Sequence, residues 1–263
     1  MQHPLFSIVT VCYNSSATIG RTIKSVLAQE CKDYEYVIVD GASKDETVNL
    51  IKCYEPQFEG RMRWVSEPDK GIYDAFSKGC KMAQGKYVWI VNSDDYIEPD
   101  ALVNLKDLIA TFDADNLPVI SGWANFVSED GKTVKSIMKC SKAGLERAYK
   151  KDSIGVVHPA TLVPKCVYEK TGYFDERYKI IGDIDWFQRA YKLGIPFYFF
   201  EKPITNMADG GISNVVGIKP RIRDRKILLQ KKYTNPMRRY YQLTGWIYRW
   251  YKAKFAKLIH YHR

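Results

Sequence analysis

FSIVTVCYN at residues 6–14 and YEYVIVDGAS at residues 34–43 are runs of β-branched and aromatic residues that each end at polar residues. Two later stretches have the same character, MRWVSEPD at 62–69 and KYVWIVNSDD at 86–95. Such a run is typical of a buried strand that feeds a loop. We therefore predict four strands in this part of the chain, each followed by a polar loop.

Three segments between these strands carry apolar residues at helical spacing, and they cover residues 15–30, 45–55 and 72–83. This alternation predicts an α/β fold with a doubly wound, mostly parallel sheet and helices on both faces, like the Rossmann-like half of nucleotide-binding proteins. Further along, Glu129-Asp130-Gly131 predicts a hairpin turn. Residues 171–193 predict a loop that enters a helix.

Polar side chains gather where the predicted strands end, which is the edge at which such sheets bind ligands. Tyr13 follows the first strand, Asp40 ends the second, Lys70 follows the third, and Asp94-Asp95 follow the fourth. The adjacent carboxylates supply hard oxygen ligands for Mg²⁺ or Mn²⁺, and the Lys70 charge suits phosphate. A solvated turn is the alternative for an Asp-Asp pair. The third carboxylate in the same crevice favours a metal site.

Composition and motifs exclude several classes of protein. The chain has 263 residues, is 46% hydrophobic and 14% aromatic, and has 17 Gly and six Cys, so collagen-like, disordered and disulfide-scaffold proteins are excluded. No GxGxxG follows the first strand and no P-loop motif occurs, so neither a dinucleotide dehydrogenase nor a P-loop NTPase is supported. No apolar run reaches the roughly 20 residues that span a bilayer, and no basic signal-peptide region is present. We therefore expect a cytoplasmic protein.

Positive charge is concentrated toward the C-terminal end. The formal net charge is +10, and residues 219–263 contain fourteen Lys or Arg and a single acid, Asp224. Within residues 240–258, aromatic and aliphatic residues recur at helical spacing with basic residues beside them. We therefore predict a body, residues 1–218, and a basic aromatic helical tail, residues 219–263. Such a helix is typical of one that lies on an anionic membrane surface. A helix packed on the body with solvated charges is the alternative.

Five ordered stretches resemble the motifs of family 2 glycosyltransferases with the GT-A fold. They are FSIVTVCYN, VIVDGASKDET, SEPDKGIYDAFSKG, GKYVWIVNSDD and GYFDERYKIIGDIDWFQRA. Bacterial enzymes of exopolysaccharide, O-antigen and colanic acid biosynthesis are the most similar form. The resemblance implies an inverting, metal-dependent transfer of a sugar from a nucleoside-diphosphate sugar to an acceptor hydroxyl.

The resemblance also implies roles for individual residues. The positions expected to contact the donor nucleotide, its diphosphate or its sugar are Thr10, Val11, Tyr13, Asp40, Asp45, Lys70 and Asp94. Asp95 stands where the family holds Mn²⁺ or Mg²⁺, although the literal DXD spacing is absent.

The general base of this family usually lies in a Glu-Asp pair that opens a helix, with an Arg six residues after the Asp. In GDIDWFQR, Asp183 matches the base and Arg189 matches the Arg, while Gly182 stands at the Glu position. Asp185 is the rival for the base. A helix N-cap is the structural alternative for Asp183.

The expected donor is a nucleotide sugar, with a UDP-sugar favoured over a GDP- or dTDP-sugar. The expected acceptor is a saccharide linked to polyprenyl diphosphate, which suits an enzyme that is peripheral at the inner face of the cell membrane. Two alternatives remain: a nucleic-acid- or anionic-surface-binding protein that acts through the basic tail, and a non-catalytic module that binds nucleotide sugars. We expect no nucleic acid partner, because the body of the chain is net acidic.

Overall fold

The computed structural model describes residues 3–208, 217–232 and 234–261. Strands and helices alternate in its first part, as the hydrophobic pattern predicts. In chain order these elements are β1 (Phe6–Cys12), α1 (Ile19–Leu27), β2 (Tyr34–Asp40), α2 (Thr47–Tyr54), the 3-10 helix η1 (Glu55–Phe58), β3 (Met62–Ser66), α3 (Ile72–Met82) and β4 (Tyr87–Ile90).

The rest of the body is less regular, and two helices follow it. These elements are β5 (Tyr96–Ile97), α4 (Ala101–Ile109), β6 (Val119–Val127), β7 (Val134–Met138), α5 (Lys142–Lys150), the 3-10 helix η2 (His158–Ala160), β8 (Thr161–Pro164), α6 (Lys165–Thr171), α7 (Gly182–Lys192), β9 (Phe197–Ala208), α9 (Ile218–Lys232) and α10 (Pro236–Tyr261). The predicted hairpin turn is confirmed, because β6 and β7 pair antiparallel on either side of it.

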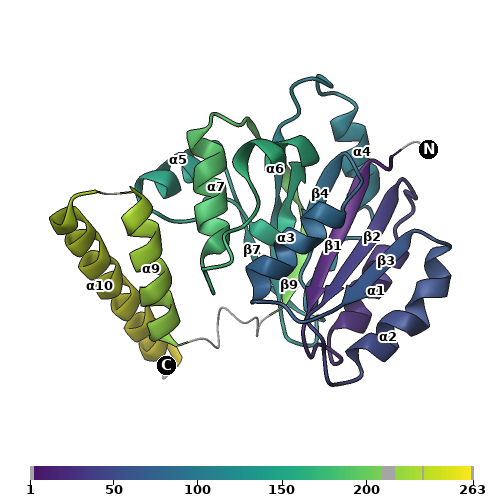
Figure 1. Cartoon of the computed structure of the whole chain (residues 1–263), viewed down its shortest axis with the longest axis horizontal. Helices are drawn as coiled ribbons and strands as arrows, with labels where there is room; N and C mark the ends of the chain where they lie inside the picture. The colour runs from purple at the N-terminus through teal and green to yellow at the C-terminus, as the bar shows by residue number, and fades with distance from the viewer. Residues whose placement is uncertain (1–2, 209–216, 233, 262–263) are drawn as a thin grey trace.

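One sheet organises the described residues, with the strand order β3-β2-β1-β4-β8-β6-β9-β5 and with β7 paired to β6. The first four strands in this order are parallel. β8 is antiparallel to both of its neighbours, so β6 and β9 run in the same direction as β4. The predicted α/β class with a mostly parallel sheet is confirmed (Figure 1).

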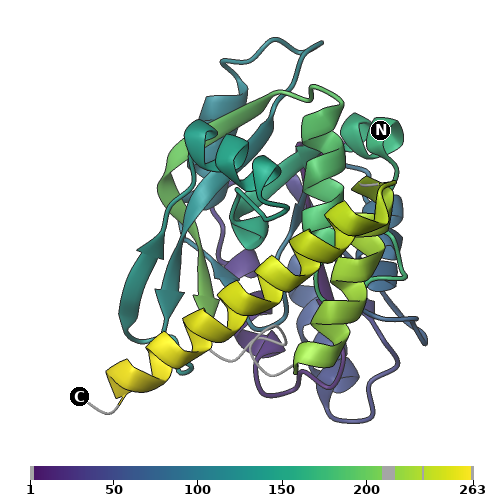
Figure 2. The same ribbon diagram turned by 90° about the vertical axis from the view of Figure 1, so that its left-hand side faces the viewer.

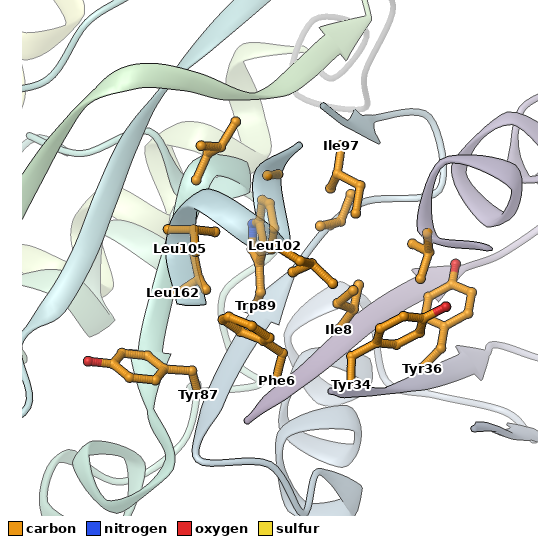
Figure 3. Close-up of a cluster of buried hydrophobic side chains, with 14 of the residues drawn as sticks. Phe6, Ile8, Tyr34, Tyr36, Tyr87, Trp89, Ile97, Leu102, Leu105 and Leu162 are labelled. Atoms are coloured by element: carbon orange, nitrogen blue, oxygen red, sulfur yellow. The ribbon is translucent and has the colours of Figure 1, made fainter. Parts of the chain in front are cut away.

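Helices cover both faces of the sheet, which explains the apolar character of its strands. Every residue of β1 and β2 is buried. Phe6 and Ile8 pack with α1, α2 and α4 in one cluster, while Val9 and Val11 pack with α3, α6 and α7 in another. Figure 3 shows the first cluster, in which Trp89 of β4 lies close to Leu102 of α4. A strand that is buried on both faces has no polar side to alternate with.

The two C-terminal helices form an antiparallel pair beside α7 (Figures 1 and 2). α9 packs on the body through the buried side chain of Leu228. α10 lies on the outer side of α9, and the Arg225 guanidinium of α9 lies 5.4 Å from the centroid of the Trp246 ring of α10. Tyr240, on the predicted apolar stripe, is 60% exposed. The division of the chain at residue 218 stays a prediction.

Candidate active site

The register of the parallel strands brings their carboxyl ends to one edge. Cys12 lies opposite Asp40, and Asp40 lies opposite Ser66. The loop after β4 joins the same edge, because the Ser93 hydroxyl lies 2.9 Å from the Ser15 hydroxyl in the loop after β1. Loops from all four parallel strands therefore meet in one region, as the sequence predicts.

The Asp40 carboxylate is fully buried and holds these loops together. Its Oδ2 accepts hydrogen bonds from the Ser66 hydroxyl at 2.6 Å and from the Ser43 backbone N–H at 2.9 Å. Its Oδ1 accepts a hydrogen bond from the Ser43 hydroxyl. Burial raises the pKa of the neighbouring Cys12 thiol, and the Asp40 charge adds to the effect. Asp40 thus fixes the positions of the chain segments at the carboxyl ends of β2 and β3.

Tyr13 is the exposed member of this group, with 61% of its surface accessible. Its ring borders Gly41, where a Cβ atom would lie 3.3 Å from the Tyr13 ring and 2.6 Å from the Asp69 carboxylate. A side chain at position 41 would therefore collide with both neighbours. Asp69, which the sequence analysis did not single out, also accepts a hydrogen bond from the Gly71 N–H at 2.8 Å.

Three of the residues predicted to bind the nucleotide-sugar donor have side chains that contact other parts of the protein. The Thr10 hydroxyl is buried and accepts a hydrogen bond from the Tyr36 hydroxyl at 3.1 Å, and the Val11 side chain is buried in the core. The Asp45 carboxylate accepts hydrogen bonds from the Ser16 N–H at 3.0 Å and from the Thr47 hydroxyl at 2.6 Å. These bonds lower the pKa of Asp45 and join the loop after β1 to the start of α2.

Asp94 and Asp95 follow β4 in a setting that suits a hard cation. Asp95 is 3% exposed, and its carboxylate accepts hydrogen bonds from the Asn92 amide at 3.0 Å and from the Ala208 N–H at 3.3 Å. Burial raises the pKa of Asp95 to about 8, with the Asp94 charge adding to it, and burial also raises the pKa of Asp94. In the described residues no Lys or Arg forms an ion pair with either carboxylate. The Arg21 guanidinium donates a hydrogen bond to the Asp94 backbone carbonyl at 2.9 Å, and its charge opposes the rise in the pKa of both carboxyls. Adjacent carboxylate oxygens at a strand end fit Mg²⁺ or Mn²⁺.

The protein alone offers few ligands at this point. Among the residues that the structure describes, no group of three or more His, Cys, Asp or Glu could hold a metal ion. A cation at Asp95 would take its other oxygen ligands from water, from the backbone or from a bound diphosphate. Mg²⁺ is commonly bound in this way, by one or two carboxylates together with substrate phosphates.

Asp183 lies in the first turn of α7 and contacts Tyr73 of α3. Its Oδ1 accepts hydrogen bonds from the Tyr73 hydroxyl at 3.3 Å and from the Ile184 N–H at 2.8 Å. The pKa of Asp183 is raised to about 6, and burial of the carboxyl is the main cause. A carboxyl group with such a pKa is ionised at neutral pH and is a stronger base than an ordinary aspartate.

The geometry also explains the glycine that replaces the usual Glu. A Cβ atom at Gly182 would lie 2.8 Å from atoms of the Tyr73 ring. Since real Cβ atoms do not approach ring carbons so closely, Tyr73 and a side chain at position 182 exclude each other. Tyr73 and Gly182 are thus a matched pair that the sequence analysis missed, because 108 residues of chain lie between them.

Asp185 is in a different environment, although it lies only two residues further along. Its buried carboxylate accepts hydrogen bonds from the Tyr178 hydroxyl at 3.1 Å, from Arg189 Nε at 3.0 Å and from Lys231 Nζ at 2.9 Å. Arg189 also donates to backbone carbonyls, including that of Tyr173 at 2.8 Å. Two cations and a hydroxyl saturate Asp185, so it serves to join α7 to α9.

The loop before α7 is joined to the loop before α3 and to α9. Lys70 is exposed, and its ammonium lies 3.1 Å from the Glu176 carboxylate. The Lys179 ammonium donates a hydrogen bond to the Lys70 carbonyl. The Asp224 carboxylate, fully buried on α9, accepts hydrogen bonds from the backbone N–H groups of residues 179 and 180 at 2.9 and 2.7 Å. Sequence charge alone assigned Asp224 no role.

A family model described as "Glycosyl transferase family 2" matches residues 7–172. A PGL/p-HBAD biosynthesis glycosyltransferase of Mycobacterium bovis is 26% identical over 195 residues, which cover 73% of this chain and 71% of that protein. An uncharacterized glycosyltransferase of Mycobacterium tuberculosis is 34% identical over 109 residues, which cover 41% of this chain and 40% of that one.

Solved structures share the fold at low sequence identity. Staphylococcus aureus TarS, residues 1–349 in complex with UDP-GlcNAc, superposes with a TM-score of 0.67 at 18% identity, over 90% of this chain and 69% of that one. The match spans 41% of the longer TarS chain. A mannosyltransferase from Pyrobaculum calidifontis, in complex with GDP-Man and Mn²⁺, has a TM-score of 0.60 at 18% identity, over 88% and 63% of the two chains. The family match, the ordered motifs and the shared architecture lead to one conclusion: the chain belongs to glycosyltransferase family 2 and has the GT-A fold.

Proposed function

We propose that this protein transfers a sugar from a nucleoside-diphosphate sugar to a hydroxyl of a saccharide acceptor, with inversion of configuration. The acceptor oxygen forms a bond to the anomeric carbon as the bond from that carbon to the diphosphate breaks. The nucleoside diphosphate leaves with the electron pair, and the proton of the acceptor hydroxyl passes to a carboxylate of the enzyme. The family supports the transferase activity, and the site supports the assignment of the base.

Asp183 is the proposed general base, and its contact with Tyr73 carries the proposal. A base must be ionised at working pH and yet hold a proton well. Burial gives Asp183 a pKa of about 6, and the Tyr73 hydroxyl at 3.3 Å orients its carboxylate. Asp185 is less suited to accept a proton, because its carboxylate forms ion pairs with Arg189 and Lys231. We therefore favour Asp183 over its rival.

The donor would bind along the carboxyl edge of β1, β2 and β4. Tyr13 offers an exposed ring for the base, while the buried Asp40 and Asp45 hold the loops on which the donor would lie. Thr10 and Val11 would contribute through their backbone, since their side chains are in the core.

We assign the metal and the diphosphate of the donor to the residues that follow β3 and β4. Asp95 would hold Mn²⁺ or Mg²⁺, with Asp94 directed to the sugar or ribose. Such a cation, when bound, neutralises charge on the departing diphosphate. Lys70, exposed beside Glu176, would supply a further positive charge. A UDP-sugar is the favoured donor, and a GDP-sugar is the next choice. The two solved structures of the same fold named above are complexes with UDP-GlcNAc and with GDP-Man, which supports this class of donor.

The acceptor is proposed to be a saccharide linked to polyprenyl diphosphate, used in bacterial surface polysaccharide biosynthesis. No helix in the described ranges has both the length and the hydropathy needed to cross a membrane. α10 instead carries exposed aromatic side chains, among them Tyr241 at 66% and Tyr248 at 68%, beside the exposed Arg238 and Arg249. This combination favours contact with an anionic membrane surface, at the cytoplasmic face.

Thermal unfolding of the purified chain tests the donor site. UDP, GDP, dTDP and their common sugars are added one at a time, each with and without Mn²⁺. A ligand that binds only the native state stabilises it by RT ln(1 + [L]/Kd), which is about 2.7 kcal/mol at one hundred times Kd. We expect one nucleotide sugar to raise the melting temperature in a manner that depends on Mn²⁺.

Asp95→Asn is the matched variant, because it keeps the shape of the side chain and cannot become a carboxylate ligand. The shift should disappear in this variant, while the unliganded melting temperature is retained, because a carboxyl with a pKa of about 8 is mostly uncharged at neutral pH before a ligand binds. If no nucleotide sugar stabilises the wild-type chain, the donor site is refuted.

A further inference from the structure

A cavity of about 490 Å³ lies between α3, the loop before α7 and the first turn of α9, and no role has been given to it so far. Its walls are formed by Gly71, Ile72, Lys179, Ile180, Lys219, Pro220 and Arg223. Its volume lies within the range of small-molecule sites in proteins. The cavity is thus large enough to hold a phosphate or diphosphate group and part of an attached chain.

The chemistry of the walls is unusual for a surface hollow. Ile72, Ile180 and Pro220 supply apolar surface, while the remaining side chains are cationic. No acidic residue lines this cavity within the described part of the chain. Lys219 is exposed and forms no ion pair or hydrogen bond among the described residues. Several cations without an opposing carboxylate fit an anion, and apolar walls fit a hydrocarbon group.

The cavity is held in a defined shape by buried contacts. Asp224 binds the backbone of residues 179 and 180 from α9, so two of the walls are joined by a buried carboxylate. The Lys179 ammonium is held over the α3 side by its hydrogen bond to the Lys70 carbonyl. A Cβ atom at Gly71 would lie 3.0 Å from this ammonium, and Gly71 has a φ of +129°. The positive φ is the reason that glycine is required at this position.

The position of the cavity relates it to the proposed base. Ile72 precedes Tyr73, whose hydroxyl donates to Asp183, and Ile180 lies three residues before Asp183. A ligand held in the cavity would therefore contact the two segments that carry Tyr73 and Asp183. The donor residues, in contrast, lie at the ends of β1, β2 and β4.

We infer that this cavity binds the phosphate ester of an amphiphilic acceptor, with the cations on the phosphate and the apolar walls on the first part of the lipid chain. This inference rests on the proposed function, which requires an acceptor next to Asp183. It goes further, because it assigns named residues to the lipid-phosphate end of that acceptor and not to its sugar.

Binding of geranyl diphosphate to the full chain, measured by calorimetry, tests the inference. Inorganic pyrophosphate is the probe without a hydrocarbon chain. The pocket variant is Lys219→Ala/Arg223→Ala, in which both substituted side chains are exposed. The control variant is Lys192→Ala/Lys226→Ala, which removes two exposed cations from α7 and α9 that do not line the cavity. Nucleotide-sugar binding is measured in all three proteins.

We expect the pocket variant to weaken geranyl diphosphate binding about tenfold or more, since each lost charge-assisted hydrogen bond is worth about a factor of ten. The control variant should bind as the wild type does, and pyrophosphate should bind more weakly than geranyl diphosphate. Nucleotide-sugar affinity should be the same in all three proteins.

Four results would overturn the inference: unchanged binding in the pocket variant, equal weakening in the control, pyrophosphate binding as tight as geranyl diphosphate, or loss of nucleotide-sugar binding in the pocket variant. The last result would assign the cations to the donor. A different result would refute the proposed function itself: a wild-type chain that binds no nucleotide sugar. A chain that binds nucleotide sugar but not geranyl diphosphate refutes the inference alone.

Discussion

Asp224 offers a sharp test of how the C-terminal helices support the site. Its carboxylate is fully buried and accepts backbone hydrogen bonds at 2.9 Å from Lys179, 2.7 Å from Ile180 and 3.3 Å from Ile181. These residues directly precede α7, which begins at Gly182 and carries Asp183. We therefore regard Asp224 as a positioning residue for the proposed base.

The expected cost of removing it follows from the two shorter bonds. A hydrogen bond to a charged group contributes about 1.5–3 kcal/mol, so Asp224→Ala should lower the free energy of unfolding by roughly 3–6 kcal/mol. That is a large share of the about 5–15 kcal/mol by which domains are stable. Asp224→Asn keeps an oxygen acceptor and should lose less than half of this amount.

Urea unfolding gives the stability, and the pH profile of turnover separates positioning from stability. Measured well below the melting temperature, Asp224→Asn should lower kcat and leave donor binding intact. The apparent pKa of the base should fall from about 6 toward the ordinary aspartate value, because a loosened loop admits water to Asp183. An Asp224→Ala protein with wild-type stability, or an Asp224→Asn protein with an unchanged pH profile and kcat, would refute this reasoning.

Three further predictions follow from the same contacts. Because burial raises the pKa of Asp183 to about 6, the ionised base is present above that pH, and kcat should fall tenfold per pH unit below it; a rate that stays level down to pH 4.5 would contradict the assignment. Tyr73→Phe removes the hydroxyl 3.3 Å from Asp183 and keeps the ring against Gly182, so stability should change by less than about 1 kcal/mol while kcat falls several-fold; an unchanged kcat would exclude an orienting role. Arg238→Ala/Arg249→Ala removes two exposed cations of α10, and at about 1 kcal/mol for each its binding to anionic vesicles should weaken roughly thirtyfold in a flotation assay; equal binding would remove the basis for membrane contact.

The parallel half of the fold could be predicted because its signals are local. Each of β1 to β4 is a short apolar run with polar residues after it, and α1 to α3 show helical spacing. Strand pairing in the other half depends on distant contacts. β8, only four residues long, inserts between β4 and β6, and no pattern within four residues specifies such neighbours.

The candidate site divides in the same way. Asp183 could be selected because GDIDWFQR resembles the family's base motif, and Asp94-Asp95 from their place after a strand. The Tyr73 contact, the need for Gly182 and the saturation of Asp185 by Lys231 arise only when segments far apart in the chain meet. Asp224 looked like a lone acid in a basic tail, and only its burial reveals that it holds the loop before α7.

The most direct test of the account uses Asp183→Asn and measures donor binding and sugar transfer on the same protein. Asn is similar in shape and cannot act as a base, so the nucleotide sugar should bind with wild-type affinity and Mn²⁺ dependence. Transfer to the acceptor should fall about 10²–10⁴-fold, which is the usual contribution of a general base. Asp185→Asn, the matched comparison, should mainly lower stability, because it unbalances Arg189 and Lys231. Wild-type transfer by Asp183→Asn would contradict the central claim.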